Sequence, residues 1–327
     1  MVKEILLIIL GFVLLIKGAD FLVDGASSIA KRLRIPEIVI GLTIVSIGTS
    51  MPELFVSTTS AIHGSADMSI GNIIGSNICN LLLILGLSAV ISPVKFQKST
   101  RNIDIPLCFL STIVFFVLCN IGNVVSFVDS IILLVLFVGF ILYTLYIAKK
   151  GLAAVAAENT KEKQEAPSAE EKKEKKENSI FKNIVLIILG IVGLKFGGDF
   201  TVDNAVLIAQ DLGLSEKVIG LTILAIGTSL PELVTSVVAA IKGNDDIAIG
   251  NIIGSNIFNI LMIIGVSAFI TPLSYNTSYN MQLYILLFSL ILLEIFAFTK
   301  PKDKMTRANG IIYVILYAAY MAMLFII

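Results

Sequence analysis

The sequence predicts an all-α, polytopic membrane protein with ten transmembrane helices, arranged as two five-helix repeats of inverted topology. Two observations lead to this prediction. Of the 327 residues, 56% are hydrophobic and only 15% are charged, which lies outside the range of ordinary soluble domains. In addition, a long segment of the first half returns almost unchanged in the second half.

Ten apolar segments of about twenty residues follow one another, and each is long enough to cross the roughly 30 Å of bilayer hydrocarbon. They span residues 5–30, 38–62, 69–91, 103–121, 124–148, 182–208, 217–241, 248–270, 280–299 and 308–327. The first segment carries Asp20 and Asp24 and has no small-residue cleavage site, so we expect it to remain as a helix. The predicted organisation is a first repeat at 1–148, a charged linker at 149–181 and a second repeat at 182–327.

The placement of basic residues predicts the orientation, because short loops rich in Lys and Arg face the cytoplasm. Such residues follow the first, third and ninth segments: Lys31, Arg32, Arg34, Lys95, Lys98, Arg101, Lys300, Lys302, Lys304 and Arg307. We therefore expect a multi-pass protein of the cell membrane with both termini outside. The linker 149–181 would be cytoplasmic, and its Lys- and Glu-rich composition predicts no packed core.

The two halves align without a gap. Residues 36–93 and 215–272 share 36 identities in 58 positions at a constant offset of 179 residues (215 − 36). Each half has five crossings, which is an odd number, so the second copy should enter the membrane in the opposite sense. Inverted repeats of this kind are typical of secondary transporters, whose ions and substrates bind near the middle of the bilayer.

Each copy places one glutamate, Glu53 or Glu232, in an otherwise apolar helix. An acid in hydrocarbon costs roughly 2.5–3.5 kcal/mol, so two at equivalent positions indicate a shared polar cavity. Pro52 and Pro231 come directly before these acids and should free backbone carbonyls about four residues earlier. Freed carbonyls at membrane depth can bind cations. For one motif alone, a proline kink with a hydrogen-bonded glutamate would explain the pattern equally well.

The second repeated motif is GNIIGSNICN at 71–80, which returns as GNIIGSNIFN at 250–259. On a helix, Asn72, Ser76 and Asn80 form one polar stripe at the helical period. This stripe could face the glutamates, or it could join helices by hydrogen bonds. The motif also has G-x-x-x-G spacing, which predicts close helix contacts at Gly71, Gly75, Gly250 and Gly254.

Other polar residues receive simpler interpretations. Acidic and basic residues recur together towards the ends of the first and sixth segments, and we expect ion pairs or an entrance lining from Lys17, Asp20, Asp24, Lys195, Asp199 and Asp203. Three cysteines without metal-type spacing are expected as packed free thiols: Cys79, Cys108 and Cys119. His63 ends a segment and receives no role.

Two carboxylates, freed carbonyls and hydroxyls suit Ca²⁺, which takes six to eight oxygen ligands, better than Mg²⁺, which requires a tighter octahedron. Two glutamates also neutralise one Ca²⁺ or two Na⁺.

At these motifs the chain resembles the sodium/calcium exchanger family of the cation/calcium antiporter superfamily, of the prokaryotic type with two alpha repeats. Both G-T-S-x-P-E and G-N-x-x-G-S-N are present twice. The resemblance implies exchange of Ca²⁺ for Na⁺ by alternating access, with the first and sixth helices sliding against the rest. It implies ion ligands at Glu53, Glu232, Thr49, Thr228, Ser50, Ser229, Ser76, Ser255, Asn80 and Asn259. It implies no catalytic residue and no cofactor, because Ca²⁺ and Na⁺ are substrates.

Two departures from related families bear on the ions. Potassium-dependent exchangers carry an aspartate where this chain has Asn259, which argues against K⁺ co-transport. Proton-coupled relatives carry a glutamate where this chain has Gly75 and Gly254, which favours Na⁺ as the driving ion. A proton-coupled antiporter of Ca²⁺ or another divalent cation remains the alternative.

Three other classes fit poorly. An enzyme is disfavoured because the chain has no H-E-x-x-H motif and no plausible Ser/His pair. A channel is disfavoured because an inverted repeat around one dense site fits alternating access better. The net charge of zero gives no reason to expect a nucleic acid partner. Apart from the ions and the bilayer, no obligate partner is expected.

Overall fold

The computed structural model describes residues 2–162, 180–213 and 225–326, and most of these residues are helical. Within these ranges, eight helices are long and apolar enough to cross a membrane, and the bent pair Glu37–Thr49 and Met51–Ile62 makes a ninth. The expected segment 217–241 begins outside the described residues. Its described part contains a twelve-residue apolar helix, Leu230–Ile241. The predicted count of ten is therefore not confirmed.

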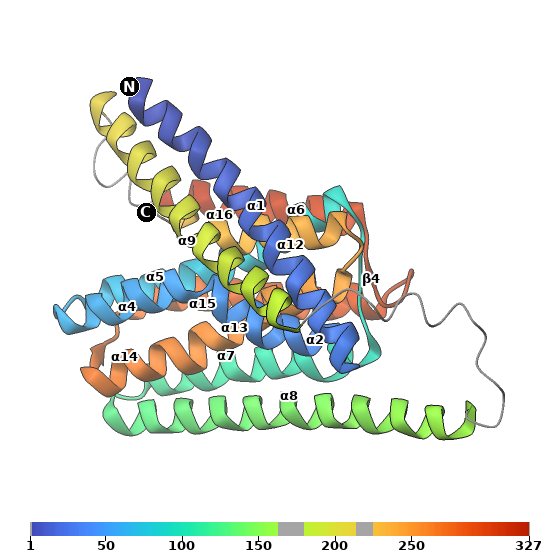
Figure 1. Cartoon of the computed structure of the whole chain (residues 1–327). Coiled ribbons are helices and arrows are strands. Elements are labelled where there is room, and N and C mark those ends of the chain that lie inside the picture. Colours follow the sequence, from blue (N-terminus) through green and yellow to red (C-terminus); the bar gives the residue numbers. More distant parts are fainter. Residues whose placement is uncertain (1, 163–179, 214–224, 327) are drawn as a thin grey trace.

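The helices and strands follow the two repeats (Figure 1). Those of the first half are α1 (Val2–Leu33), α2 (Glu37–Ile40), η1 (Gly41–Val45), α3 (Ser46–Thr49), α4 (Met51–Ile62), α5 (Ala66–Ile78), η2 (Cys79–Leu85), α6 (Gly86–Ile91), β1 (Val94–Lys95), η3 (Thr100–Asp104), α7 (Ile105–Asn120), β2 (Val124–Val125) and α8 (Phe127–Glu162). Those of the second half are α9 (Ile180–Asp211), α11 (Ala225–Gly227), α12 (Leu230–Ile241), α13 (Asp245–Ile257), η6 (Phe258–Ile264), α14 (Gly265–Ile270), β3 (Leu273–Ser274), η7 (Thr277–Tyr279), α15 (Asn280–Phe298), β4 (Lys304–Met305) and α16 (Arg307–Ile326).

The two spans that carry the G-N-I-I-G-S-N motif form the centre of the molecule. In Ala66–Ile91 and Asp245–Ile270, 78% and 83% of the most apolar window is buried, against 17% in the span of α8. A helix that is apolar or small on all sides belongs in such a core. The sequence thus places its second motif at the point where both repeats meet.

Two short antiparallel ribbons join the repeats. β1 pairs with β4 through Val94 opposite Met305, and β2 pairs with β3 through Val125 opposite Leu273. Each ribbon takes one strand from each half of the chain. They connect the halves outside the helical core, at the turns that precede and follow the spans.

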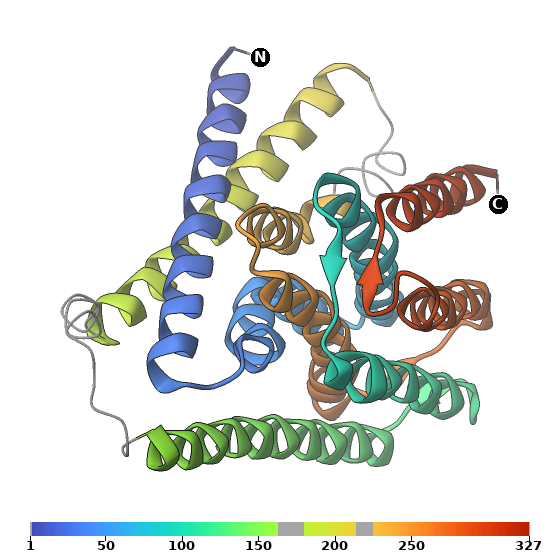
Figure 2. The same cartoon turned by 90° about the vertical axis from the view of Figure 1, so that its right-hand side faces the viewer.

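α1 and α9 pack against each other through a glycine seam, defined by Gly11, Gly18, Gly190 and Gly197. A Cβ added at Gly11 would lie 2.8 Å from the carbonyl oxygen of Gly197, and one at Gly18 would lie 2.8 Å from that of Gly190. The contact runs in antiparallel register with a spacing of seven residues on each helix. Backbone therefore touches backbone along this pair, which crosses the flank of the bundle (Figure 2).

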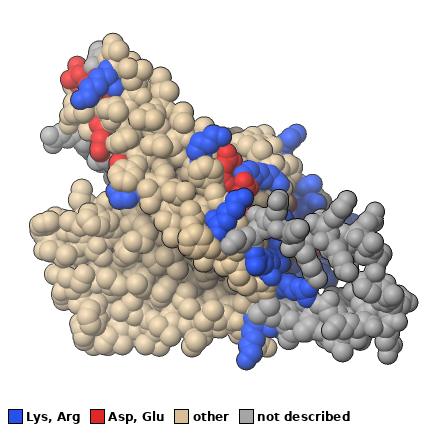
Figure 3. All heavy atoms as spheres, viewed as in Figure 1, with Lys and Arg blue, Asp and Glu red and all other residues tan. Residues whose placement is uncertain are grey.

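The surface agrees with insertion in a bilayer. Most Lys and Arg side chains visible in Figure 3 gather near the C-terminal ends of α1 and α8, and the rest of this face is largely uncharged. Large apolar side chains such as Phe55, Leu142 and Phe181 are exposed. The two ends of the chain lie on the side away from the C-terminal end of α8 (Figure 1). Which of these sides faces the cytoplasm stays a prediction.

Two smaller predictions also meet the structure here. α8 continues to Glu162, so the first part of the predicted linker, 149–162, extends a membrane helix, and residues 163–179 lie outside the described ranges. The three cysteines are free and buried, as predicted.

Candidate cation-binding site

Both glutamates enter the interior where a membrane helix is interrupted. In the first repeat, α3 ends at Thr49, Ser50 leaves the helical conformation, and α4 begins after a bend of 50°. In the second repeat, α11 ends at Gly227 and α12 begins at Leu230. Each proline then lies in a first helical turn, where a missing N–H costs little. A helix C-terminus, whose carbonyls attract cations, thus precedes a helix N-terminus, which stabilises a carboxylate.

The two carboxylates are buried and are linked across the repeats by serine side chains. Glu53 and Glu232 are 1% and 0% exposed. Ser50 donates a hydrogen bond to Glu232 Oε1 at 2.7 Å, and Ser229 donates one to Glu53 Oε1 at 3.4 Å. Each serine stands three residues before the glutamate of its own repeat, yet it bonds the glutamate of the other repeat. Reciprocal contacts of this kind are what a twofold relation between the repeats produces.

The serines of the second motif lie beside the same carboxylates. Ser76 donates to Glu53 Oε1 at 3.4 Å. The Ser255 hydroxyl lies 2.9 Å from that of Ser50 and 3.4 Å from the carbonyl oxygen of Ser46. The polar stripe predicted on this motif therefore faces the glutamates at its serine positions.

Four asparagines, Asn77, Asn80, Asn256 and Asn259, form a buried cluster across the two repeats, here called the asparagine cluster. Asn80 donates to Asn256 Oδ1 at 3.0 Å, and Asn259 donates to Asn77 Oδ1 at 2.9 Å. Asn77 and Asn256 donate to each other's backbone carbonyls at 3.2 and 3.4 Å. The amide donors of Asn80 and Asn259 are thus occupied, and this fixes how their Oδ1 atoms are turned.

Four buried oxygens at the site accept no hydrogen bond in the structure: Glu53 Oε2, Glu232 Oε2, Asn80 Oδ1 and Asn259 Oδ1. A buried polar atom without a partner costs about 1–3 kcal/mol. These four are related in pairs by the sequence repeat, and all are acceptors. A bound cation satisfies oxygen acceptors of this kind, whereas another protein acceptor does not.

The two repeats differ in how their threonines are bonded. Thr49 donates to Asn251 Oδ1 at 3.0 Å. Asn251 and its equivalent Asn72 make matching bonds, to Ser236 at 2.9 Å and to Ser57 at 3.0 Å. Thr228, the equivalent of Thr49, makes no such bond: within the described residues its hydroxyl is buried without a partner. The site is therefore enclosed differently on its two sides, although the residues are equivalent.

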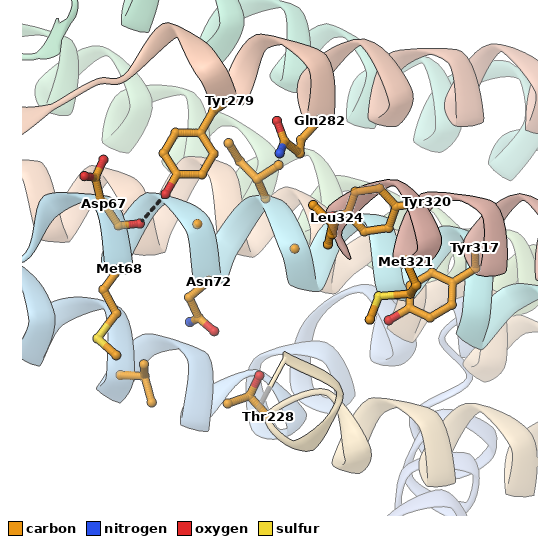
Figure 4. A pocket seen from close by; sticks show the side chains of 14 residues that line it. Asp67, Met68, Asn72, Thr228, Tyr279, Gln282, Tyr317, Tyr320, Met321 and Leu324 are labelled. Carbon is orange, nitrogen blue, oxygen red and sulfur yellow. Dashed lines mark hydrogen bonds between the residues drawn. The ribbon is translucent and has the colours of Figure 1, made fainter. Parts of the chain in front are cut away.

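A pocket of about 500 Å³ lies on the less enclosed side. Asn72 and Thr228 line it together with Tyr279, Tyr317 and Met321. Figure 4 shows Asn72 projecting from α5 and the hydroxyl of Thr228 pointing towards α5, while Tyr279 reaches the Asp67 carbonyl. Thr228, whose hydroxyl has no partner among the described residues, therefore lies at the wall of this pocket.

The glycines of the second motif are also packed differently in the two repeats. A Cβ at Gly254 would lie 2.8 Å from Leu42 Cα, and one at Gly250 would lie 2.9 Å from Gly41 Cα. Gly71 and Gly75 line the pocket, and among the described residues Gly75 has no atom within 4 Å of its Cβ position. The predicted close helix contact is thus confirmed for the second repeat, and the described part of the first repeat does not make it.

The predicted site residues come together in one place, with Thr228 at its edge. Sequence reasoning missed Asn77, Asn256 and Asn251, which hold the predicted residues in position. These asparagines occupy identical positions in both motifs, and this repetition could have identified them from the sequence. Their role was hidden because the contacts of Asn77 and Asn256 are made with the other repeat, which a helical stripe within one segment does not reveal.

Comparison with known proteins adds independent evidence. The family model for the sodium/calcium exchanger protein matches residues 3–146 and 182–326. The sodium/calcium exchanger MaX1 of Methanosarcina acetivorans is 35% identical over 350 residues, covering 98% of each chain. The inner membrane protein YrbG of Escherichia coli is 34% identical over 291 residues, covering 87% of each. A solved structure of the sodium-calcium exchanger NCX_Mj matches with a TM-score of 0.82 and 34% identity over 98% of each chain.

Proposed function

The chain belongs to the sodium/calcium exchanger family, and on this premise we propose that it is a secondary active antiporter that exchanges Ca²⁺ for Na⁺ by alternating access. The observation that carries the proposal is the set of four buried, unbonded oxygens from Glu53, Glu232, Asn80 and Asn259. Two carboxylates and two amides supply negative charge and neutral oxygen together, which is the ligand chemistry of Ca²⁺.

The charge of the site explains why transport is exchange. Two bare carboxylates in a low-dielectric interior repel each other and lose their hydration, so moving them empty past the middle of the membrane is costly. One Ca²⁺ or two Na⁺ cancels their charge. The transporter therefore changes its exposed side when loaded with either ion, and a further Na⁺ would make exchange move net charge.

The other site residues supply further ligand oxygens or orient them in this proposal. The backbone oxygens of Thr49 and Thr228, at the helix interruptions, act as ligands. Hydroxyl oxygens come from Ser50, Ser229, Ser76 and Ser255. The asparagine cluster orients the amide oxygens, and no cofactor is required, because both ions are substrates.

The membrane arrangement is part of the same proposal. Ten crossings as two inverted repeats would require the segment 217–241 to provide the seventh crossing. The reciprocal serine and asparagine contacts support the twofold relation. The basic loops support an orientation with both termini outside and the linker in the cytoplasm.

The choice of coupling ion rests on what the cavity contains. Asn259 brings a neutral amide where an aspartate would add charge for K⁺, so we propose K⁺-independent exchange. Gly75 and Gly254 bring no carboxyl group that could carry a proton beside the site, which favours Na⁺ over H⁺.

The test is ⁴⁵Ca²⁺ uptake into proteoliposomes that are loaded with Na⁺ and diluted into Na⁺-free medium. K⁺-loaded and acid-loaded vesicles serve as controls. Uptake driven by internal Na⁺ alone is expected. Uptake that follows the proton gradient and ignores Na⁺ would reject sodium coupling and favour the proton-coupled alternative.

The carboxylates are tested in the same vesicles. Glu53→Gln and Glu232→Gln should each abolish Ca²⁺ uptake, because one remaining charge no longer balances Ca²⁺. The matched control is Glu294→Gln on α15, which changes a partly buried glutamate outside the site. Normal exchange by either cavity variant would remove the central role of the glutamates.

A further inference from the structure

Lys242 ties the end of α12 to α1 by two ion pairs, here called the Lys242 bridge. Its Nζ lies 3.0 Å from Asp20 Oδ1 and 2.8 Å from Asp24 Oδ1. The side chain of Lys242 is 28% exposed. Partial burial alone would lower the pKa of Lys242, but the hydrogen bonds and charges of Asp24 and Asp20 outweigh burial and raise this pKa. The bridge therefore holds its proton and its charge over the physiological range.

The repeat gives every member of this bridge an equivalent. At the offset of 179 residues, His63 corresponds to Lys242, Asp199 to Asp20 and Asp203 to Asp24. These three do not meet in the structure. Asp199 pairs with Lys195 of its own helix at 2.7 Å, and within the described ranges neither the His63 side chain nor the Asp203 side chain makes a hydrogen bond or ion pair.

Helix packing has the same asymmetry. α1 packs along α12, where Leu230 and Val234 join its hydrophobic cluster. The equivalent residues on α4, Met51 and Phe55, are 45% and 74% exposed. Over the described lengths of α4 and α9, no comparable packing is made. One face of the bundle is therefore closed by α1, and the equivalent face is not closed by α9.

The α1–α9 pair itself keeps the twofold symmetry. The contact of Gly11 with Gly197 is equivalent, at the same offset, to the contact of Gly190 with Gly18. The asymmetry therefore lies in where the pair rests on the bundle, and not within the pair. An opposite displacement of this pair would exchange the two faces, bringing α9 onto α4 and taking α1 off α12.

We propose that the Lys242 bridge alternates with a His63 bridge, formed by His63 with Asp199 and Asp203, and that each bridge holds one face of the transporter closed. The proposal rests on the alternating access of the proposed function. Histidine changes its charge between about pH 5 and 8, unlike lysine. Acid on the His63 face, which the sequence predicts to be external, therefore favours the arrangement closed on that face.

Among the described residues, few charged groups lie on the elements that pack against α4 or that would approach it in the alternative arrangement. Asp67 stands at the start of α5, which packs against α4, and Lys195, Asp199 and Asp203 lie on α9. α14 also packs against α4 and carries no charged residue between Gly265 and Ile270. Lys195 already neutralises Asp199 in part, which leaves Asp203 as the stronger partner for a protonated imidazole.

Two matched cysteine pairs can show by cross-linking which face is closed, and neither pair changes a bridge residue. Ser28 and Asn244 line one pocket together with Asp24 and Lys242, so Ser28→Cys with Asn244→Cys reports the Lys242 face. The equivalent pair for the His63 face is Ser65→Cys with Leu207→Cys. Both are placed in full-length protein in proteoliposomes, with the three native cysteines replaced by alanine, and treated with a short bifunctional thiol reagent.

Cross-linking of the Ser65/Leu207 pair should rise roughly two- to fivefold, the size of an exposed ion pair, when the pH on that face falls from about 8 to about 5.5. The Ser28/Asn244 pair should fall correspondingly. His63→Gln should remove this pH response, and His63→Lys should make the yield high and independent of pH.

The proposal is overturned if the Ser65/Leu207 pair never cross-links while the Ser28/Asn244 pair does, or if His63→Gln keeps the full response. Because cross-linking does not depend on which ion is carried, it tests the bridges even where ⁴⁵Ca²⁺ uptake fails.

Discussion

Asn256 offers the sharpest test of how the cavity is built, because it contributes no unbonded oxygen to the site. It accepts the hydrogen bond from Asn80 Nδ2 at 3.0 Å, and Asn256→Ala removes that acceptor. Asn80 then has a buried donor without a partner, which costs about 1–3 kcal/mol unless the amide rotates. Rotation would turn the nitrogen of Asn80 towards the cation in place of its oxygen.

Either outcome should weaken Ca²⁺ binding. Partners that orient a metal ligand typically contribute about 10- to 100-fold in affinity, which corresponds to roughly 1.4–2.8 kcal/mol. The assay is calorimetric titration of the purified protein with Ca²⁺ in Na⁺-free buffer, with thermal unfolding measured in parallel. Ser267→Ala is the matched control, because it removes another fully buried polar group, a hydroxyl without a partner, from the second repeat.

A double mutant separates orientation from general damage. If Asn256 acts through Asn80, then adding Asn256→Ala to Asn80→Ala should cost little further affinity, so the two effects should not add. Full additivity, or unchanged Ca²⁺ affinity in Asn256→Ala, would refute the orienting role of the asparagine cluster.

Three further predictions concern the seam, the cavity and the linker. Gly18→Ala should lower stability by about 1–3 kcal/mol, because its Cβ would lie 2.8 Å from the Gly190 carbonyl oxygen. Gly139→Ala, whose Cβ would have no atom of the described residues within 4 Å, should be neutral in thermal unfolding. Asn259→Asp adds a third carboxylate to the cavity, so protons should compete better with cations and exchange should be more inhibited by acid; an unchanged pH profile of uptake would contradict this. Deleting residues 158–177 should leave ⁴⁵Ca²⁺ exchange intact, and loss of uptake in a folded deletion variant would show that the linker matters.

The sequence was most informative where chemistry and repetition coincide. Buried carboxylates in apolar helices are costly, so Glu53 and Glu232 could be singled out without a structure. The reciprocal serine contacts followed less directly, because the sequence offset says that Ser50 and Ser229 are equivalent but not that each bonds the other repeat's glutamate.

Other features depend on three-dimensional packing that local patterns do not encode. An ideal helix of 3.6 residues per turn places Asn72, Ser76 and Asn80 on one stripe, whereas Asn77 lies outside that stripe and joins the cluster through contacts with the other repeat. Two nearly identical sequences also predict two identical environments. The structure breaks that symmetry at Thr49, which bonds Asn251, and at Thr228, whose hydroxyl has no partner among the described residues.

The crossed serine contacts also bear on how such a protein could originate. Within one repeat, Ser50 stands near Glu53 in the sequence but serves Glu232, and Ser229 serves Glu53 in return. A half-length chain would therefore carry every required side chain and still be unable to assemble the pocket by itself. Under the proposed inverted topology, it would be complete only as a pair of copies inserted in opposite directions.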